Sequence, residues 1–193
     1  MKIIFDEITL RDYILSDVED EIRWTNEEKD WFHVEAPWMT LEPVDANELR
    51  SEMNKIISDM SEDGIRWRFE IEVEGRHIGN VYSYYLNHQF EHVSWDLIDE
   101  KKNAPQNHLI RAIGIEICEM EYWGRGLGTK VLTAFMNYYK HLGETHFLLE
   151  TWSGHKRMLN CAKKLGFQEV KRTKGTLTIG GKGFDELILE KRF

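Results

Sequence analysis

A glycine-rich turn between a strand pattern and a helix pattern constrains this chain more than any other feature. Residues 114–135 read GIEICEMEYWGRGLGTKVLTAF, with Gly124, Gly126 and Gly128 at alternate positions. Apolar and polar residues alternate before these glycines, and apolar residues recur at helical spacing after them. Where a strand, a glycine loop and a helix follow in this order, main-chain N–H groups at the helix N-terminus can hold an anion. The segment therefore predicts an α/β domain, and the loop is either an anion-binding loop or a tight strand-to-helix connection without a ligand.

The length and composition fit one globular domain over residues 1–193, with 41% hydrophobic and 31% charged residues. No apolar run reaches the roughly 20 residues of a membrane span, and the N-terminus lacks the apolar core of a secretion signal. Two cysteines, Cys118 and Cys161, make no disulfide framework, and the eight histidines show no metal-ligand spacing. We expect a cytoplasmic protein without a metal and without membrane association.

The charge of the chain bears on its partners. The formal net charge is −9 at pH 7. Nucleic-acid binding depends on basic patches that contact phosphates, so the acidic balance disfavours nucleic acid as the main partner. A cationic small molecule or a basic peptide end suits this balance better, although acidity mostly serves solubility.

Local patterns in the first half predict two helices, each opened by a capping box. Such a box pairs a Ser or Asp at the helix start with a glutamate three residues later. The expected elements are a strand over residues 3–10, a helix from Ser16 to about Trp24, a loop over residues 30–38 and a helix from Asp45 to Gly64.

The second half predicts mostly antiparallel strands and two further helices. Strict alternation of apolar and polar residues indicates half-exposed strands, and glycines mark the helix ends. The expected elements are strands over residues 65–73 and 77–86 joined by a turn at Glu74–Gly75, a loop over residues 87–107, a strand ending near Cys118, a helix from Gly128 to Gly143, a strand over residues 145–150, a helix ending at Gly166 and a closing hairpin.

Three anion-binding motifs compete for the glycine loop. A dinucleotide fingerprint needs GxGxxG, whereas the glycines here run GxGxG. A P-loop needs GxxxxGK[ST], whereas Thr129 separates Gly128 from Lys130. The third fits better: YWGRGLGT resembles the pyrophosphate loop of the GNAT superfamily of acetyl-CoA-dependent N-acetyltransferases, with pattern Q/R-x-x-G-x-G/A. Gly126 and Gly128 occupy its glycine positions, and Trp123 stands where the pattern has Gln or Arg.

A second signature supports this resemblance. LNCAKKLGFQEV is similar to the superfamily segment in which a helix ending in K-x-G-F leads into the sixth strand, here Lys164 to Phe167. The order of elements agrees over nearly the whole chain, and YWGRGLGTxxL is a common form in the branch related to ribosomal-protein N-terminal acetyltransferases. The resemblance implies one α/β (α+β) domain with a mixed, mostly antiparallel sheet of about seven strands, flanked by about four helices and splayed after the fourth strand.

The resemblance also implies a co-substrate, acetyl-CoA, and the groups that bind it. Main-chain amides of the loop would hold the pyrophosphate, aided by the Arg125 side chain, and amides at the end of the preceding strand would bind the pantetheine arm and polarise the thioester. The expected binding residues are Ile117, Cys118, Glu119, Gly124, Arg125, Gly126, Leu127, Gly128, Thr129 and His155.

The resemblance leaves the catalytic side chains open. Glu116 is the candidate general base, on the strand face where carboxylates of similar enzymes often act through a water, and the alternative is a surface glutamate. His155 stands where many relatives carry Asn, and it is a candidate ligand contact or general acid. Relatives use a Tyr or a Ser as acid at two further positions, where this chain has Ala162 and Met158.

The aromatic stretch over residues 30–38 lies where similar enzymes shape the acceptor pocket. We expect Trp31, Phe32, Trp38 and, at a strand end, Glu150 to line this pocket. The alternative is a purely structural role, in which these residues form an apolar cluster that packs a loop onto the core. Cys118 is expected to be a small apolar residue rather than a reactive thiol, because Glu119 is its neighbour.

These observations favour an acetyl-CoA-dependent N-acetyltransferase that acts on a primary amine by direct attack in a ternary complex. The acceptor is either a protein N-terminus or a small-molecule amine, and the protein is either a monomer or a homodimer. Two other classes stay open. One is a catalytically inactive acyl-CoA-binding sensor of the same fold, and the other is a nucleotide-binding α/β protein.

Overall fold

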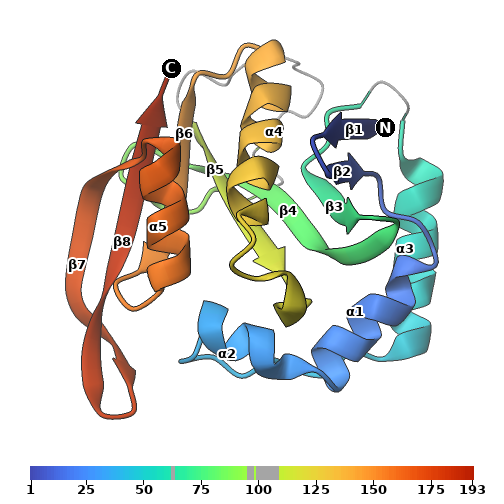
Figure 1. Ribbon diagram of the computed structural model, residues 1–193, viewed down its shortest axis with the longest axis horizontal. Helices are drawn as coiled ribbons and strands as arrows, with labels where there is room; N and C mark the ends of the chain where they lie inside the picture. The colour runs from blue at the N-terminus through green and yellow to red at the C-terminus, as the bar shows by residue number, and fades with distance from the viewer. Residues whose placement is uncertain (62–63, 95–97, 99–108) are drawn as a thin grey trace.

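The computed structural model describes residues 1–61, 64–94, 98 and 109–193 (Figure 1). Within them lie eight strands, five α-helices and two 3₁₀ helices. The strands are β1 (Lys2–Phe5), β2 (Ile8–Arg11), β3 (Arg68–Val73), β4 (Arg76–Leu86), β5 (Ile110–Ile117), β6 (His146–Trp152), β7 (Gln168–Ile179) and β8 (Lys182–Arg192). The helices are α1 (Asp17–Asn26), η1 (Lys29–Trp31), α2 (Phe32–Glu35), α3 (Ala46–Asp59), η3 (Met120–Tyr122), α4 (Leu127–His141) and α5 (Lys156–Leu165).

All eight strands form one sheet in the order β1-β2-β3-β4-β5-β6-β8-β7. Every neighbouring pair is antiparallel except β5 and β6, which are parallel. The parallel pair is joined by α4, which crosses one face of the sheet (Figure 1). The expected mixed and mostly antiparallel sheet is confirmed.

The strand and helix counts exceed the expected seven and four because two segments subdivide. The single strand expected over residues 3–10 is a hairpin of β1 and β2, and Asp6 turns the chain with φ 52°. Aspartate tolerates this left-handed conformation, which allows a turn inside an otherwise strand-like run. The loop expected over residues 30–38 was also wrong, since η1 and α2 occupy its first part.

The two expected capping boxes have different outcomes. Asp45 caps α3, because its carboxylate accepts hydrogen bonds from the amides of Asn47 and Glu48 at 2.8 and 2.9 Å. Ser16 makes no side-chain cap on α1, so the box expected there was wrong. The Asp17 carboxylate instead accepts from the Ile14 amide at 2.9 Å and fixes the entry into α1.

Two expected loop boundaries also change. The helix expected to reach Gly64 ends at Asp59. Most of the loop expected over residues 87–107 lies outside the described residues. By contrast, the turn at Glu74–Gly75 forms as predicted, with φ 52° and 80° at its two residues, the conformation of a tight hairpin turn.

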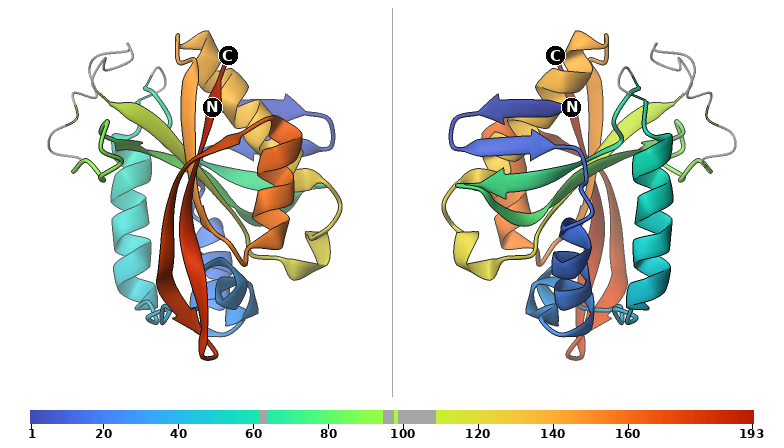
Figure 2. Two further views of the ribbon diagram at one scale, coloured as in Figure 1. Left: turned by 90° about the vertical axis from the view of Figure 1, so that its left-hand side faces the viewer. Right: turned by 90° about the vertical axis from the view of Figure 1, so that its right-hand side faces the viewer.

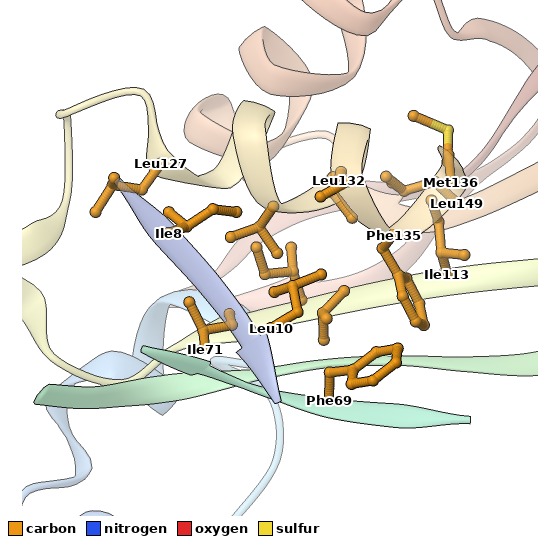
Figure 3. Packing of buried hydrophobic residues seen from close by; sticks show 14 of the residues in the cluster. Ile8, Leu10, Phe69, Ile71, Ile113, Leu127, Leu132, Phe135, Met136 and Leu149 are labelled. Atoms are coloured by element: carbon orange, nitrogen blue, oxygen red, sulfur yellow. The ribbon is translucent and has the colours of Figure 1, made fainter. Parts of the chain in front are cut away.

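The core lies between the sheet and the face of α4 (Figure 3). Phe135 and Leu132 of α4 are fully buried against Phe69 and Ile71 of β3 and Ile113 of β5. Their rings and branched chains meet in the space between helix and sheet, where α5 adds further apolar contacts. This packed layer holds the N-terminus of α4 in place.

The opposite face of the sheet is covered by α1 and α3. Figure 2 places α3 and α5 on opposite sides of the sheet. No residue of α3 is buried, although its apolar residues recur at helical spacing. No helix in the described part of the chain is long and apolar enough to cross a bilayer.

The sheet opens between β5 and β6. These strands pair only at Arg111 with Phe147 and Ala112 with Leu148, near the start of both strands. Beyond Ala112 the edge of β5 has no strand partner among the described residues. The expected splay after the fourth strand is confirmed. The strand that precedes the splay is numbered β5 because the expected first strand is divided into β1 and β2.

Candidate active site

The open edge of β5 presents main-chain groups toward the gap. The Cys118 amide donates to the Ile78 carbonyl on β4 at 2.9 Å. Because main-chain groups alternate sides along an antiparallel strand, those of Ile117 point away from β4. The Trp123 indole confirms this direction, since its Nε1 donates to the Ile117 carbonyl at 2.7 Å. The Ile117 amide therefore faces the gap.

The glycine loop stands at the mouth of this gap. Gly124 and Gly126 have φ of 76° and 81°, a left-handed conformation that favours glycine. Among the described residues, the amides of residues 124–128 find no hydrogen-bond acceptor, whereas Thr129 and Lys130 donate to the Gly126 carbonyl. Five successive main-chain donors at the N-terminus of α4 are therefore without a partner in the described part of the chain and can bind an anion.

A first cavity, the loop cavity, lies in front of these donors. It measures about 260 Å³ and is lined by the glycine loop, by Ile115 and Ile117 of β5, and by the first turns of α5. Arg157 and Lys164 of α5 also line it. The Arg157 guanidinium lies 3.6 Å above the centre of the Trp123 ring, so the residue that replaces the family's Gln or Arg holds a cation at this cavity.

A second cavity, the tyrosine cavity, lies on the other side of the gap. It measures about 600 Å³, and its wall includes Tyr82 and Tyr84 together with the carboxyl groups of Glu35, Glu116 and Glu150. The two cavities share four lining residues, which are Glu35, Ile115, His155 and Met158. A cationic cavity and an acidic cavity thus meet at one wall.

Glu35 and His155 stand at this shared wall. The His155 Nε2 lies 3.5 Å from the Glu35 Oε1, and the Trp152 indole donates to the Glu35 carbonyl at 3.1 Å. Burial raises the pKa of Glu35 to about 8, with help from the charge of Glu116. Burial and the nearby Arg157 lower the pKa of His155 to about 4. At pH 7 this pair is a protonated carboxyl beside a neutral imidazole.

Glu116 lies on β5, on the side of the sheet opposite α4. Asn80 on the neighbouring strand donates to its Oε2 at 3.1 Å. Burial raises the pKa of Glu116, and the Asn80 hydrogen bond opposes this shift. The carboxyl group reaches the tyrosine cavity, so the predicted general base is brought to the same space as Glu35.

The other expected pocket residues differ in how they reach this space. Glu150 accepts from the Tyr84 hydroxyl at 2.7 Å within the tyrosine cavity. Trp38 also lines this cavity and packs edge-on against Trp152. Phe32 lines it from α2, while Trp31 is buried in a cluster with Trp24 and Cys118. Trp31 therefore matches the packing alternative.

Three expected binding residues lie away from the loop cavity. The amides of Cys118 and Glu119 both donate to Ile78 on β4, and so only the Ile117 amide faces the gap. The Glu119 carboxylate is buried with Arg23 and Trp24, where it ties α1 to the end of β5. Arg125 is exposed over the Tyr122 ring, at 5.0 Å from its centre.

Sequence reasoning missed Glu35 and Arg157. Glu35 lies in an aromatic stretch with no clear period, and only the fold brings it beside His155. Arg157 follows Lys156 in the first turn of α5. Cations are disfavoured at a helix N-terminus, so two of them there were a signal that an anion binds nearby.

Comparisons with known proteins agree with this arrangement. Residues 7–168 match the family described as the acetyltransferase (GNAT) domain. A search of the curated proteins finds no match. Among solved structures, RimL, a ribosomal L7/L12 alpha-N-protein acetyltransferase in complex with coenzyme A, is 15% identical, with 100% of this chain and 98% of that chain covered and a TM-score of 0.71.

Two further structures have the same fold. The acetyl transferase from Salmonella typhimurium that modifies the N-terminal serine of L7/L12 is 15% identical over 97% of this chain and 96% of that chain, with a TM-score of 0.64. The microcin C7 self immunity acetyltransferase MccE, in complex with acetyl-CoA and AMP, is 19% identical over 97% and 93%, with a TM-score of 0.63. The family match covers most of the chain, which therefore belongs to the GNAT acetyltransferase family.

Proposed function

We propose that this protein is an acetyl-CoA-dependent N-acetyltransferase that acts on a primary amine in a ternary complex. One observation carries the proposal: five loop amides that have no acceptor among the described residues lie at a cationic cavity, which adjoins an acidic cavity at the open edge of β5. The family supports acetyl transfer as the general chemistry. The geometry of the site supports the acceptor class and the residue roles proposed below.

The loop cavity suits coenzyme A. The amides of residues 124–128 are placed to bind the diphosphate, with favourable charge from the α4 dipole and from Arg157 and Lys164. The Ile117 amide is placed to bind the pantetheine arm along the edge of β5. RimL and MccE, whose structures contain CoA and acetyl-CoA, support this assignment.

The tyrosine cavity suits a primary amine. Its carboxyl groups attract an ammonium ion, and its aromatic rings favour a cation further. The cavity shares Glu35 and His155 with the loop cavity, so an amine in it lies near a thioester bound in the gap. This acidic environment supports an amine rather than a carboxylate as the proposed acceptor.

The two carboxyl groups divide the proton transfers. Glu116, once deprotonated, takes the proton from the attacking amine as the C–N bond forms. Glu35 is protonated at pH 7 and adjoins both cavities, so it gives a proton to the thiolate as the C–S bond breaks. His155 is neutral and positions Glu35 rather than acting as the acid.

A thiol-release assay tests the proposal. Wild-type protein with acetyl-CoA and a panel of primary amines should release CoA thiol and form the N-acetyl product detected by mass spectrometry. Glu116→Gln should keep CoA binding and lose at least about a hundredfold in kcat/KM. CoA binding without turnover on any amine would instead support the inactive sensor, to which the changes at Ala162 and Met158 point.

A further inference from the structure

We propose that the groove between α3 and the sheet binds the apolar part of an elongated primary amine whose amino group lies at Glu116. This α3 groove measures about 1160 Å³. The inference rests on the proposed function, and it names the class of acceptor that the site takes. That class is amphipathic: one amino group followed by an extended alkyl or aryl portion.

Apolar side chains line much of the α3 groove, with the charged Glu52, Lys55 and Asp59 of α3 among them. Leu49, Met53 and Ile56 of α3 line one side, and Trp24 of α1 with Phe32 of α2 lines another. None of the three α3 side chains is buried, and Ile56 is 43% exposed. Apolar side chains that face an open groove gain free energy when an apolar ligand removes their surface from water.

The floor of the α3 groove is polar and lies on the sheet. Glu116 and Asn80 line it beside Glu70. The Glu70 carboxylate is paired with Arg68 and His77, whereas Glu116 accepts only from Asn80 and has no ion-pair partner among the described residues. An ammonium group therefore has one half-buried carboxyl without an ion-pair partner to bind.

The groove adjoins the proposed reaction site. Phe32 and Glu116 line both the α3 groove and the tyrosine cavity. The tyrosine cavity in turn shares Glu35 and His155 with the loop cavity. An amine bound at Glu116 thus has the loop cavity on one side and the apolar groove on the other, which lets its tail lie along α3 while its nitrogen reaches the thioester.

Two readouts with ethylamine, butylamine and octylamine test this acceptor class. Tryptophan fluorescence reports direct binding, because Trp24, Trp31 and Trp67 line the groove, and thiol release reports kcat/KM. We expect kcat/KM to rise about fourfold per added methylene group along the series, in line with the free energy of burying each methylene. Octylamine should also perturb the fluorescence at concentrations where ethylamine has no effect.

A blocked groove provides the matched comparison. Met53→Trp adds a large ring inside the groove, and Asn54→Trp adds the same ring at the adjacent, exposed position outside it. Met53→Trp should lower kcat/KM for octylamine at least tenfold and leave ethylamine within twofold. Asn54→Trp should leave both amines unchanged. Neither site is buried, and circular dichroism should show that each variant is folded.

The outcomes separate this inference from the proposed function. Equal kcat/KM along the amine series, or equal losses on both amines in Met53→Trp, would overturn the inference and leave N-acetylation standing. Octylamine binding that Met53→Trp abolishes, without turnover of any amine, would support the groove and contradict the proposed function. If octylamine causes no change in fluorescence, with or without turnover, the inference that the α3 groove binds the apolar part of the amine would be overturned.

Discussion

The two faces of the sheet each carry an amphipathic helix, but the two helices differ in how much of their apolar face is buried. On one face, α4 buries seven of its residues, and Phe135 and Tyr139 are inaccessible to solvent. On the other face, α3 is similarly amphipathic in sequence but buries none. The face of α4 is packed like a protein interior, while the face of α3 borders a groove of about 1160 Å³.

This difference assigns separate tasks to the two faces. Apolar burial behind α4 stabilises the fold and fixes the glycine loop at its N-terminus. The face of α3 leaves apolar surface and the Glu116 carboxyl accessible, which is what an acceptor site requires. Four predictions test this division, from the largest expected effect to the smallest.

The first prediction contrasts the stability of the two faces. Phe135→Ala should lower the free energy of unfolding by about 3–5 kcal/mol, because it leaves a cavity in the packed layer. Met53→Ala in α3 should lower it by less than about 1 kcal/mol, since that side chain is not buried. Urea denaturation followed by circular dichroism measures both. Equal losses would contradict the division between the faces.

The second prediction concerns the pH dependence of the open face. As the proposed acid, Glu35 would act in its protonated form; its pKa is raised to about 8, so activity should fall as the pH rises above 8. As the proposed base, Glu116 would act in its deprotonated form, so activity should rise as the pH passes its raised pKa. Glu35→Gln should lower kcat about a hundredfold and remove the falling limb.

The ratio of wild-type to variant rates provides the control for this profile. The amine acceptor titrates in the same range, and its own ionisation cancels when both proteins use the same amine. Glu116→Gln should remove the rising limb and retain the falling one. A ratio for Glu35→Gln that stays constant between pH 7 and pH 10 would show that Glu35 is not the acid.

The third prediction returns to the face of α4, where the loop begins the helix. Gly126→Val should weaken CoA binding about tenfold, because a branched residue is strained at φ 81° and fills space in front of the amides. Gly175→Val on β7 is the matched control, with φ 65° and equally open surroundings. Isothermal titration should show wild-type affinity for the control, and equal weakening in both variants would indicate strain alone.

The fourth prediction tests the link between the loop and the open strand edge. Trp123→Phe removes the hydrogen bond to the Ile117 carbonyl and keeps a ring beneath Arg157. The loss of one such bond costs about 1 kcal/mol, so the KM for acetyl-CoA should rise about fivefold. Trp123→Ala, which also removes the ring, should raise it further. An unchanged KM in both variants would remove Trp123 from the site.

Local sequence signals predicted the parts of the fold that short-range physics determines. The glycine positions, the Asp45 cap and the Glu74–Gly75 turn each depend on a few neighbouring residues, and the structure has all three. The Ser16 cap failed because Asp17 makes the competing hydrogen bond, a choice that the capping pattern alone does not reveal.

The contact between Glu35 and His155 at the shared wall could not be predicted from the sequence, because it depends on the fold. The two residues are 120 positions apart in sequence, and the fold places the end of α2 against Trp152 at the end of β6. Their opposite pKa shifts come from burial, which no single stretch of sequence reports. The unfilled α3 groove was equally hidden, because an amphipathic pattern predicts a buried helix face rather than an open one.

The most direct test of the account observes the loop amides themselves. In a two-dimensional ¹⁵N–¹H spectrum, CoA should shift the amide signals of Gly124, Gly126 and Gly128, whereas pantetheine, which lacks the diphosphate, should leave them in place. The Gly175 amide is the internal reference, since it is bonded to Asp185 on the closing hairpin. CoA binding that leaves the three loop signals unmoved would contradict the central claim.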